Sequence, residues 1–205
     1  MRHVSSGEER LSTMKITLAF ALPTVPAILM ILAMVGCSTS SSHSRAEAPE
    51  WISLIKNGSL DGWVQRGGKA GYRVEGDTII GTTAPNTPNS FLCTVRHYTN
   101  FIFEIDFKTL PGGNSGVQIR SHVYDEPTQL EWNGRAIRIP AGRVHGYQIE
   151  IDPSARAWSG GLYDEGRRGW LQNLTNNPAA RAAFRTNDWN HFRIHAEGDW
   201  IRSWL

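Results

Sequence analysis

The sequence has few cysteines, and this scarcity excludes a domain held together by a disulfide framework. Only two, Cys37 and Cys93, occur among 205 residues. Cys37 ends an apolar segment near the N-terminus, so Cys93 has no partner inside the folded part of the chain. We expect Cys93 to be buried as a small apolar side chain.

The chain also lacks an excess of one charge, internal repeats and a nucleotide-binding loop. Its 21 basic and 19 acidic residues nearly cancel, so no strong field favours a nucleic acid partner. No glycine cluster follows a strand and opens a helix, as phosphate-binding loops do. The chain does have eight tryptophans. Their flat rings either fill a core or stack on flat ligands such as sugar rings.

A long apolar run follows Lys15 and ends in the letters MVGC at residues 34–37. A basic start, an apolar stretch and a small residue before the cut are typical of a signal peptide. The ending resembles a bacterial lipoprotein signal, in which Cys37 becomes the lipidated first residue. A transmembrane anchor is the alternative, because the run is nearly long enough to span a bilayer. Pro23, Pro26 and the Gly-Cys ending favour the lipoprotein.

We therefore predict three regions. Residues 1–37 are a lipoprotein-type signal peptide, in which residues 1–13 are an extended n-region or precede the true start. Residues 38–50 form a Ser-rich tether, and residues 51–205 form one domain. The domain is exported and lipid-anchored through Cys37 in the cell envelope, facing the periplasm or on the outer membrane.

The residue pattern of the domain predicts many short strands separated by turn residues. In "NFIFEIDFKT", residues 100–109, apolar and polar side chains alternate as in a half-buried strand. "GYRVEGDTIIGT" predicts two strands joined across Glu75-Gly76-Asp77, and the last residues predict a hairpin turning at Gly198-Asp199. One short helix is expected after Asn177, with Pro178 at its first position.

Many short strands with Gly-rich turns and little helix predict an all-β sandwich or barrel. Several strands have a face that carries both acidic and basic side chains, in place of the Thr, Lys and Ser of an ordinary solvated face. In "HGYQIEIDP", residues 145–153, three apolar side chains point one way, and Gln148, Glu150 and Asp152 point the other. Similar rows are Glu104 and Asp106; Gln118, Arg120 and His122; and His191, Arg193 and His195. These rows form either a solvated ladder of surface ion pairs or the lining of a cleft.

Two loops favour the cleft. "PGGNSG", residues 111–116, has glycines that let a backbone approach a ligand. The loop after Asp152 gathers Trp158, Tyr163, Arg167 and Trp170, a mixture that suits a carbohydrate because rings cover its C–H face and polar groups bind its hydroxyls. The sequence requires no cofactor. A divalent cation held by oxygens is the alternative, with ligands among His122, His145, Glu150 and Asp152 but without a diagnostic spacing.

Seven stretches, in order, resemble the 3-keto-disaccharide hydrolase family. They are "SLIKNGSLDGW", "GDTIIGT", "NFIFEIDFKT", "NSGVQIRSH", "HGYQIEID", "SGGLYDE" and "DWNHFRIHAEGDWIRSWL", between Trp51 and Leu205. The resemblance implies a concanavalin-like (jelly-roll) β-sandwich and exported enzymes that cleave glycosidic bonds of sugars oxidised at C3. It marks Asn114, Ser115, Gly116, Arg120, Gln148, Glu150, Gly161 and Tyr163.

The chain departs from the family in two ways. Many relatives place Glu before Gln on the central strand, whereas here Gln148 precedes Glu150. The family domain also continues beyond the stretch that matches the last residues, so the sandwich is expected to be C-terminally incomplete.

Cleavage next to a C3 ketone needs a base for the C2 proton, a cation or donor at the ketone and an acid for the leaving oxygen. We assign Glu150 or Asp152 as base, Arg120 as the electrostatic partner and His122 or His145 as acid. Substrate contacts are expected from Asn114, Gln118, Gln148, Trp158, Tyr163, Arg167 and Trp170.

Two other functions fit the same strands. One is a carbohydrate-binding module without catalysis. The other is a laminarinase-like glycosidase using the acids at 150 and 152. Retaining glycosidases hold their carboxyls about 5–5.5 Å apart, and residues i and i+2 of a strand lie roughly 6–7 Å apart, so this function ranks last.

Overall fold

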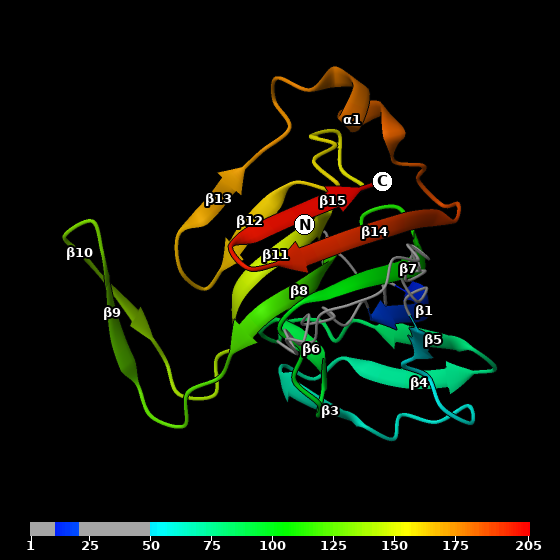
Figure 1. The fold of residues 1–205 in the computed structure, drawn as a ribbon, viewed down its shortest axis with the longest axis horizontal. Coiled ribbons are helices and arrows are strands. Elements are labelled where there is room, and N and C mark those ends of the chain that lie inside the picture. Colours follow the sequence, from blue (N-terminus) through cyan, green and yellow to red (C-terminus); the bar gives the residue numbers. More distant parts are fainter. Residues whose placement is uncertain (1–10, 21–49) are drawn as a thin grey trace, which may run out of the picture.

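The structure, a computed structural model, describes residues 11–20 and 50–205 and is built almost entirely of antiparallel strands (Figure 1). The prediction of an all-β sandwich with little helix is confirmed. The jelly-roll connection of its strands stays a prediction. No helix in the described part of the chain is long and apolar enough to cross a membrane.

The first layer is a seven-stranded antiparallel sheet with the order β15-β14-β7-β1-β5-β4, and β2 pairs with β1 beside this path. Its strands are β1 (Leu11–Phe20), β2 (Glu50–Ser53), β4 (Gly71–Glu75), β5 (Thr78–Thr82), β7 (Phe101–Thr109), β14 (Asn190–Glu197) and β15 (Trp200–Trp204). The two predicted turns are confirmed, because they join β4 to β5 and β14 to β15. The first is one residue shorter than predicted, since Glu75 still belongs to β4 and pairs with Thr78.

Strand β1 lies inside the range predicted as a signal peptide, for which no strand of the domain was expected. It pairs with β7 from Ser12↔Thr109 to Ala19↔Ile102 and with β5 from Leu11↔Thr82 to Lys15↔Thr78. A short apolar run has the composition of a signal core and of a buried strand alike, so composition does not separate the two. Cleavage before Cys37 stays a prediction, and Cys37 lies outside the described residues.

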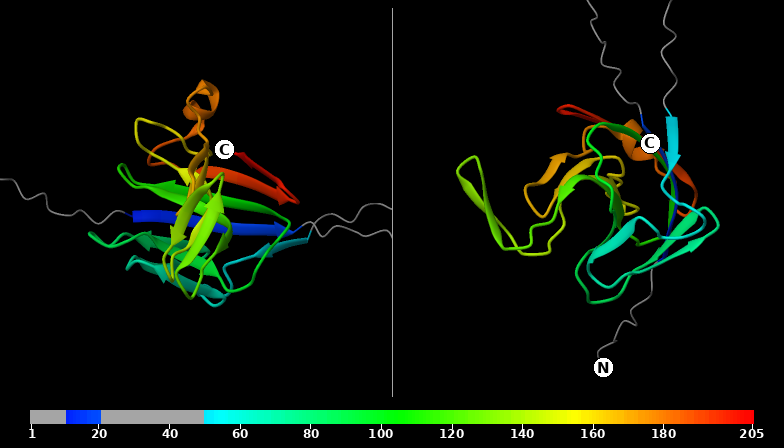
Figure 2. Two further views of the ribbon diagram at one scale, coloured as in Figure 1. Left: turned by 90° about the vertical axis from the view of Figure 1, so that its left-hand side faces the viewer. Right: turned by 60° about the horizontal axis from the view of Figure 1, so that its bottom comes forward.

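The second layer is a four-stranded sheet with the order β13-β12-β11-β8, together with the smaller pair β3-β6. Its strands are β3 (Trp63–Gly67), β6 (Ser90–Thr94), β8 (Ser115–His122), β11 (His145–Ile151), β12 (Leu162–Glu165) and β13 (Gly169–Gln172). The hairpin of β9 (Thr128–Trp132) and β10 (Arg135–Ile139) stands away from both layers in Figure 1 and in the right view of Figure 2.

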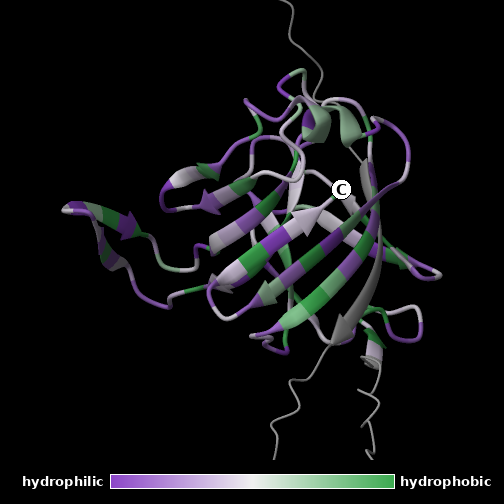
Figure 3. Ribbon diagram, turned by 45° about the horizontal axis from the view of Figure 1, so that its top comes forward, coloured by the Kyte–Doolittle hydropathy of each residue, from purple (hydrophilic) through white to green (hydrophobic). Residues whose placement is uncertain are grey.

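The core fills the space between the layers. On β7 the burial alternates as predicted, with Phe101, Phe103, Ile105 and Phe107 turned inward. They pack with Ile149 and Ile151 of β11, among others, in one apolar cluster. The alternation is visible as bands along the strands in Figure 3. Helix α1 (Pro178–Ala183) confirms the predicted cap, since the Asn177 side chain accepts a hydrogen bond from Ala180 N.

Candidate active site

The polar face of β11 looks away from the core and into a cleft. Gln148 is the register partner of Gln118 on β8 and of Tyr163 on β12, so these three side chains share one face. Glu150 lies on the same face opposite Gly116. Ile149 and Ile151 lie on the other face, in the apolar cluster. Glu150 is nevertheless only 4% exposed, so this face is not a solvated exterior.

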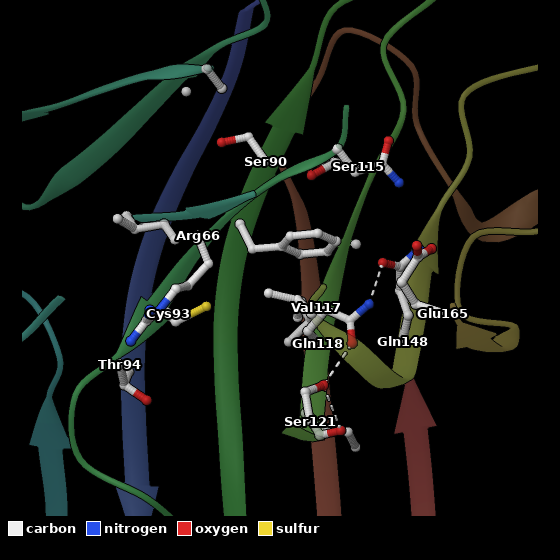
Figure 4. Close-up of a pocket in the computed structure, with 18 of the residues that line it drawn as sticks. Arg66, Ser90, Cys93, Thr94, Ser115, Val117, Gln118, Ser121, Gln148 and Glu165 are labelled. Carbon is white, nitrogen blue, oxygen red and sulfur yellow. Dashed lines mark hydrogen bonds between the residues drawn. The ribbon is translucent and has the colours of Figure 1, made fainter. Parts of the chain in front are cut away.

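Two amide side chains hold the Glu150 carboxylate. Oε1 accepts a hydrogen bond from Asn114 Nδ2 at 2.8 Å, and Oε2 accepts one from Gln148 Nε2 at 2.8 Å. The Gln148 amide is itself fixed, because its Oε1 accepts from Gln118 Nε2 at 3.0 Å. Ser121 Oγ donates to Gln118 Oε1 at 2.7 Å. This chain of donors fixes the orientation of the carboxylate, and Figure 4 shows its links from Ser121 through Gln118 to Gln148.

Gly116 leaves room for this arrangement. A Cβ atom at Gly116 would lie 2.6 Å from both Cγ and Cδ of Gln148 and 3.0 Å from the carbonyl oxygen of Ile149. Any larger residue would therefore push Gln148 away from Glu150. This is a physical reason for glycine opposite the carboxylate.

Asp152 follows the end of β11 and organises the next loop. Oδ2 accepts hydrogen bonds from Arg156 Nε at 2.8 Å and from Trp158 N at 3.2 Å, and Oδ1 accepts one from Ser154 N at 3.1 Å. Burial alone would raise the pKa of Asp152, but the hydrogen bonds from Ser154, Arg156 and Trp158 outweigh it and lower the pKa. Asp152 is therefore a fixed, ionised acceptor.

An aromatic wall stands beside the carboxylate. The ring of Trp170 meets those of Trp158 and Tyr163 edge-on, at centroid distances of 4.8 and 5.2 Å. The Arg156 guanidinium lies over Trp158 at 4.9 Å and over Trp170 at 5.0 Å. Of the residues predicted to bind substrate, Trp158, Tyr163 and Trp170 are thus brought together with Asn114, Gln118 and Gln148.

A cleft of 1150 Å³ runs along β8 and separates it from β6. Its lining includes Asn114, Gln118, Gln148, Glu150, Arg156, Tyr163 and Trp170, but not Trp158, which packs against Trp170. Figure 4 shows Ser115, Gln118 and Gln148 on one side of it, with Arg66 and Cys93 on the other. The volume exceeds that of an ordinary site for a small ligand, which holds about 300–1,000 Å³. There is room for a disaccharide beside Glu150. Cys93, expected to be buried, is half-buried and lines this cleft.

The structure turns the Arg120 side chain away from Glu150. Its guanidinium donates hydrogen bonds to the carbonyl oxygens of Gly198 and Thr99. Arg120 has a positive φ of 48°, and β8 has an irregular register here, since Ile119 pairs with Tyr147 but His122 pairs with His145. Such a bulge breaks the two-residue alternation from which the shared face was predicted.

The two histidines lie at the far end of the same strands. His145 begins β11 and is the register partner of His122. It lies five positions before Glu150, roughly 16 Å along a strand. His145 is fully buried, and burial lowers its pKa despite the hydrogen bond between Nδ1 and the Arg143 carbonyl. Neither ring is brought together with the Glu150 carboxylate.

Arg167 lies on the opposite face of the sheet from the cleft. It pairs with the fully buried Asp164, which also binds Arg168, and its guanidinium lies 5.2 Å from the centre of the Tyr147 ring. The described residues contain no group of three or more His, Cys, Asp or Glu side chains placed to hold a metal ion.

Sequence reasoning missed Arg156. Arg156 lies in a loop, where side chains do not alternate between the two faces of a sheet, so the sequence pattern does not predict which way it points. The available signal was its spacing, four residues after Asp152 and two before Trp158. Glu165 was also missed; it faces the cleft from β12 and is paired with Arg143.

No curated protein matches the chain. Residues 50–205 match the family described as the 3-keto-alpha-glucoside-1,2-lyase-like domain. That range includes β2 to β15 and every residue of the cleft named above. The chain therefore belongs to the family of 3-keto-alpha-glucoside-1,2-lyase-like domains.

Proposed function

We propose that this protein cleaves the glycosidic bond of 3-keto-disaccharides or related 3-keto-glycosides, with Glu150 as the general base. The observation that carries the proposal is a contrast among the buried carboxylates. Asp152, Asp164 and Glu165 each accept a hydrogen bond from an arginine. Glu150 is held instead by two neutral amides. It is thus the buried carboxylate that takes up a proton without breaking a hydrogen-bonded ion pair.

The chemistry suits a base of this kind. A ketone at C3 acidifies the neighbouring C2 proton, which a carboxylate then removes. The C2–H electron pair moves into the C2–C3 bond, and the carbonyl becomes an enolate. The enolate collapses with formation of a C1–C2 double bond and loss of the C1 oxygen, which takes a proton. Water added across the double bond completes a net hydrolysis.

The surroundings of Glu150 supply the contacts that such a sugar needs. Asn114 and Gln148 present amides beside the carboxylate, and their remaining polar atoms suit sugar hydroxyls. Tyr163 and Trp170 offer aromatic surface to a pyranose ring. A laminarinase-like reaction would need a second free carboxyl, but Asp152 is committed to its loop.

The test is turnover of a 3-keto-disaccharide by the wild type and by Glu150→Gln, beside the unoxidised parent sugar. Glu150→Gln keeps the size and removes the basicity, and loss of a positioned base lowers the rate about 10²–10⁴-fold. Glu104→Gln is the matched control. Glu104 lies on β7 in a partly exposed ion pair with Arg193 of β14, and such a pair contributes little to stability.

Turnover of the keto-sugar alone, lost in Glu150→Gln but kept in Glu104→Gln, supports the proposal. Binding of the sugar without turnover by the wild type would overturn it in favour of a carbohydrate-binding module. Full turnover by a folded Glu150→Gln protein would show that Glu150 is not the base.

A further inference from the structure

Arg156 is held unusually firmly for a residue in a loop. Its guanidinium is packed against two tryptophans, with its central carbon 4.9 and 5.0 Å from the ring centres of Trp158 and Trp170. Its Nε donates to Asp152 Oδ2 at 2.8 Å. Aromatic contacts fix the plane of the group, and the hydrogen bond fixes its rotation within that plane.

The outer nitrogens of this fixed group reach the base. Nη2 lies 3.9 Å from Glu150 Oε1, longer than a hydrogen bond. The side chain is 42% exposed, and it lines the cleft together with Glu150. A donor and a carboxylate therefore border the same space without closing on each other.

We propose that Arg156 is a catalytic residue that donates hydrogen bonds to the C3 ketone oxygen and stabilises the enolate formed there. This inference rests on the proposed function. As Glu150 takes the C2 proton, the electron pair moves toward the C3 oxygen, which becomes negative. A fixed cation at that oxygen lowers the barrier, because it binds the charge that develops in the transition state.

The geometry matches the substrate. C2 and the C3 oxygen are attached to the same carbon, so a base for one and a cation for the other must lie within a few ångströms. Glu150 and Arg156 meet this requirement. Within residues 50–205, no other Lys, Arg or His nitrogen lies within 4.0 Å of Glu150. Arg120 is committed to two backbone carbonyls, and Arg143 to Glu165.

The experiment separates enolate formation from bond cleavage. A 1-deoxy-3-keto sugar has no leaving group at C1, so its C2 proton exchanges with deuterated water without elimination. The exchange rate is measured by proton NMR for the wild type, Arg156→Gln and Arg156→Lys. The control is Arg202→Gln, which removes another arginine stacked on a tryptophan, 5.2 Å from the ring centre of Trp200 on the edge strand β15.

We expect exchange to fall about 10²–10³-fold in Arg156→Gln, as for loss of an oxyanion donor. It should fall less in Arg156→Lys, which keeps the charge but loses the planar group. Arg202→Gln should match the wild type. Guanidinium ion added to Arg156→Ala should restore part of the exchange rate, which a residue that only orders the loop would not show.

Wild-type exchange rates in Arg156→Gln, or a rate lost in Arg156→Ala and not restored by guanidinium, would overturn this assignment while leaving Glu150 as base. A wild type that neither exchanges the C2 proton nor cleaves a 3-keto-disaccharide would instead overturn the proposed function. The two failures are therefore distinguishable.

Discussion

Strand β1 conflicts with the predicted removal of the signal peptide. The sequence predicts that residues 1–36 are removed when Cys37 is lipidated, yet residues 11–20 form the strand between β7 and β5. Without β1, the β4-β5 pair is no longer joined to β7, β14 and β15. We predict that a chain beginning at Ser38 folds less stably than the full chain and self-associates.

The size of the effect follows from the ladders. β1 pairs with eight residues of β7 and five of β5. Ladders of this length hold on the order of ten hydrogen bonds, and each contributes about 1 kcal/mol net. Even half of that is comparable with the whole stability of a domain, about 5–15 kcal/mol. The two edges left open would also present unpaired backbone groups to other chains.

The assay compares residues 38–205 with the full chain and with residues 11–205, which keep β1. Thermal melting gives stability, light scattering after size exclusion gives the oligomer, and hydrogen exchange reports the amides of β5 and β7. In the full chain, Ile16→Pro tests the same ladder, because proline removes a backbone donor from the middle of β1. Residues 38–205 should lose protection at β5 and β7 and form oligomers. Monomers with an unchanged melting temperature and protected amides would refute the reasoning.

Three further predictions follow from single residues. Gly116→Ala should lower the free energy of unfolding by about 1–3 kcal/mol, because the added methyl group overpacks Gln148, and it should also lower turnover. Gly71→Ala is the control, because a methyl group there meets open space and should change neither quantity. Thermal melting and turnover of both variants test this prediction. Because burial lowers the pKa of His145 below its ordinary 6.5, the unfolded chain binds the proton first as pH falls, so stability should decline below pH 6.5. His145→Gln should reduce this decline, and equal melting temperatures of the wild type at pH 7.5 and 5.5 would contradict it. Cys37→Ala should abolish incorporation of labelled palmitate in a bacterial host and shift the protein out of the membrane fraction; membrane retention after processing would favour an anchor helix.

The parts of the fold that the sequence predicted are those set by local pattern. Alternation along residues 101–109 predicted the buried face of β7, and Gly198 predicted the last hairpin. The side chain of Asn177 capped the helix as its type suggests. The placement of β1 could not be predicted from the sequence. It depends on which distant strands an apolar segment pairs with, and composition does not determine that pairing.

The candidate site was predictable to the extent that the ladder is regular. Gln118, Gln148 and Tyr163 share a face because each is paired in register with its neighbour. Arg120 is two residues beyond Gln118 and would share that face in an unbroken strand. A single extra residue at this point turns its side chain toward the carbonyls of Thr99 and Gly198.

The same reasoning explains why two acids that are two residues apart take different roles. Glu150 is still within β11, so the strand fixes its side chain on the cleft face, between the amides of Asn114 and Gln148. Asp152 lies beyond Ile151, where β11 ends, and its carboxylate binds the backbone of the following loop. That loop returns Arg156 to within 3.9 Å of Glu150. Asp152 therefore holds the cation that faces Glu150, and in the proposed reaction Glu150 is the acid that takes up the proton.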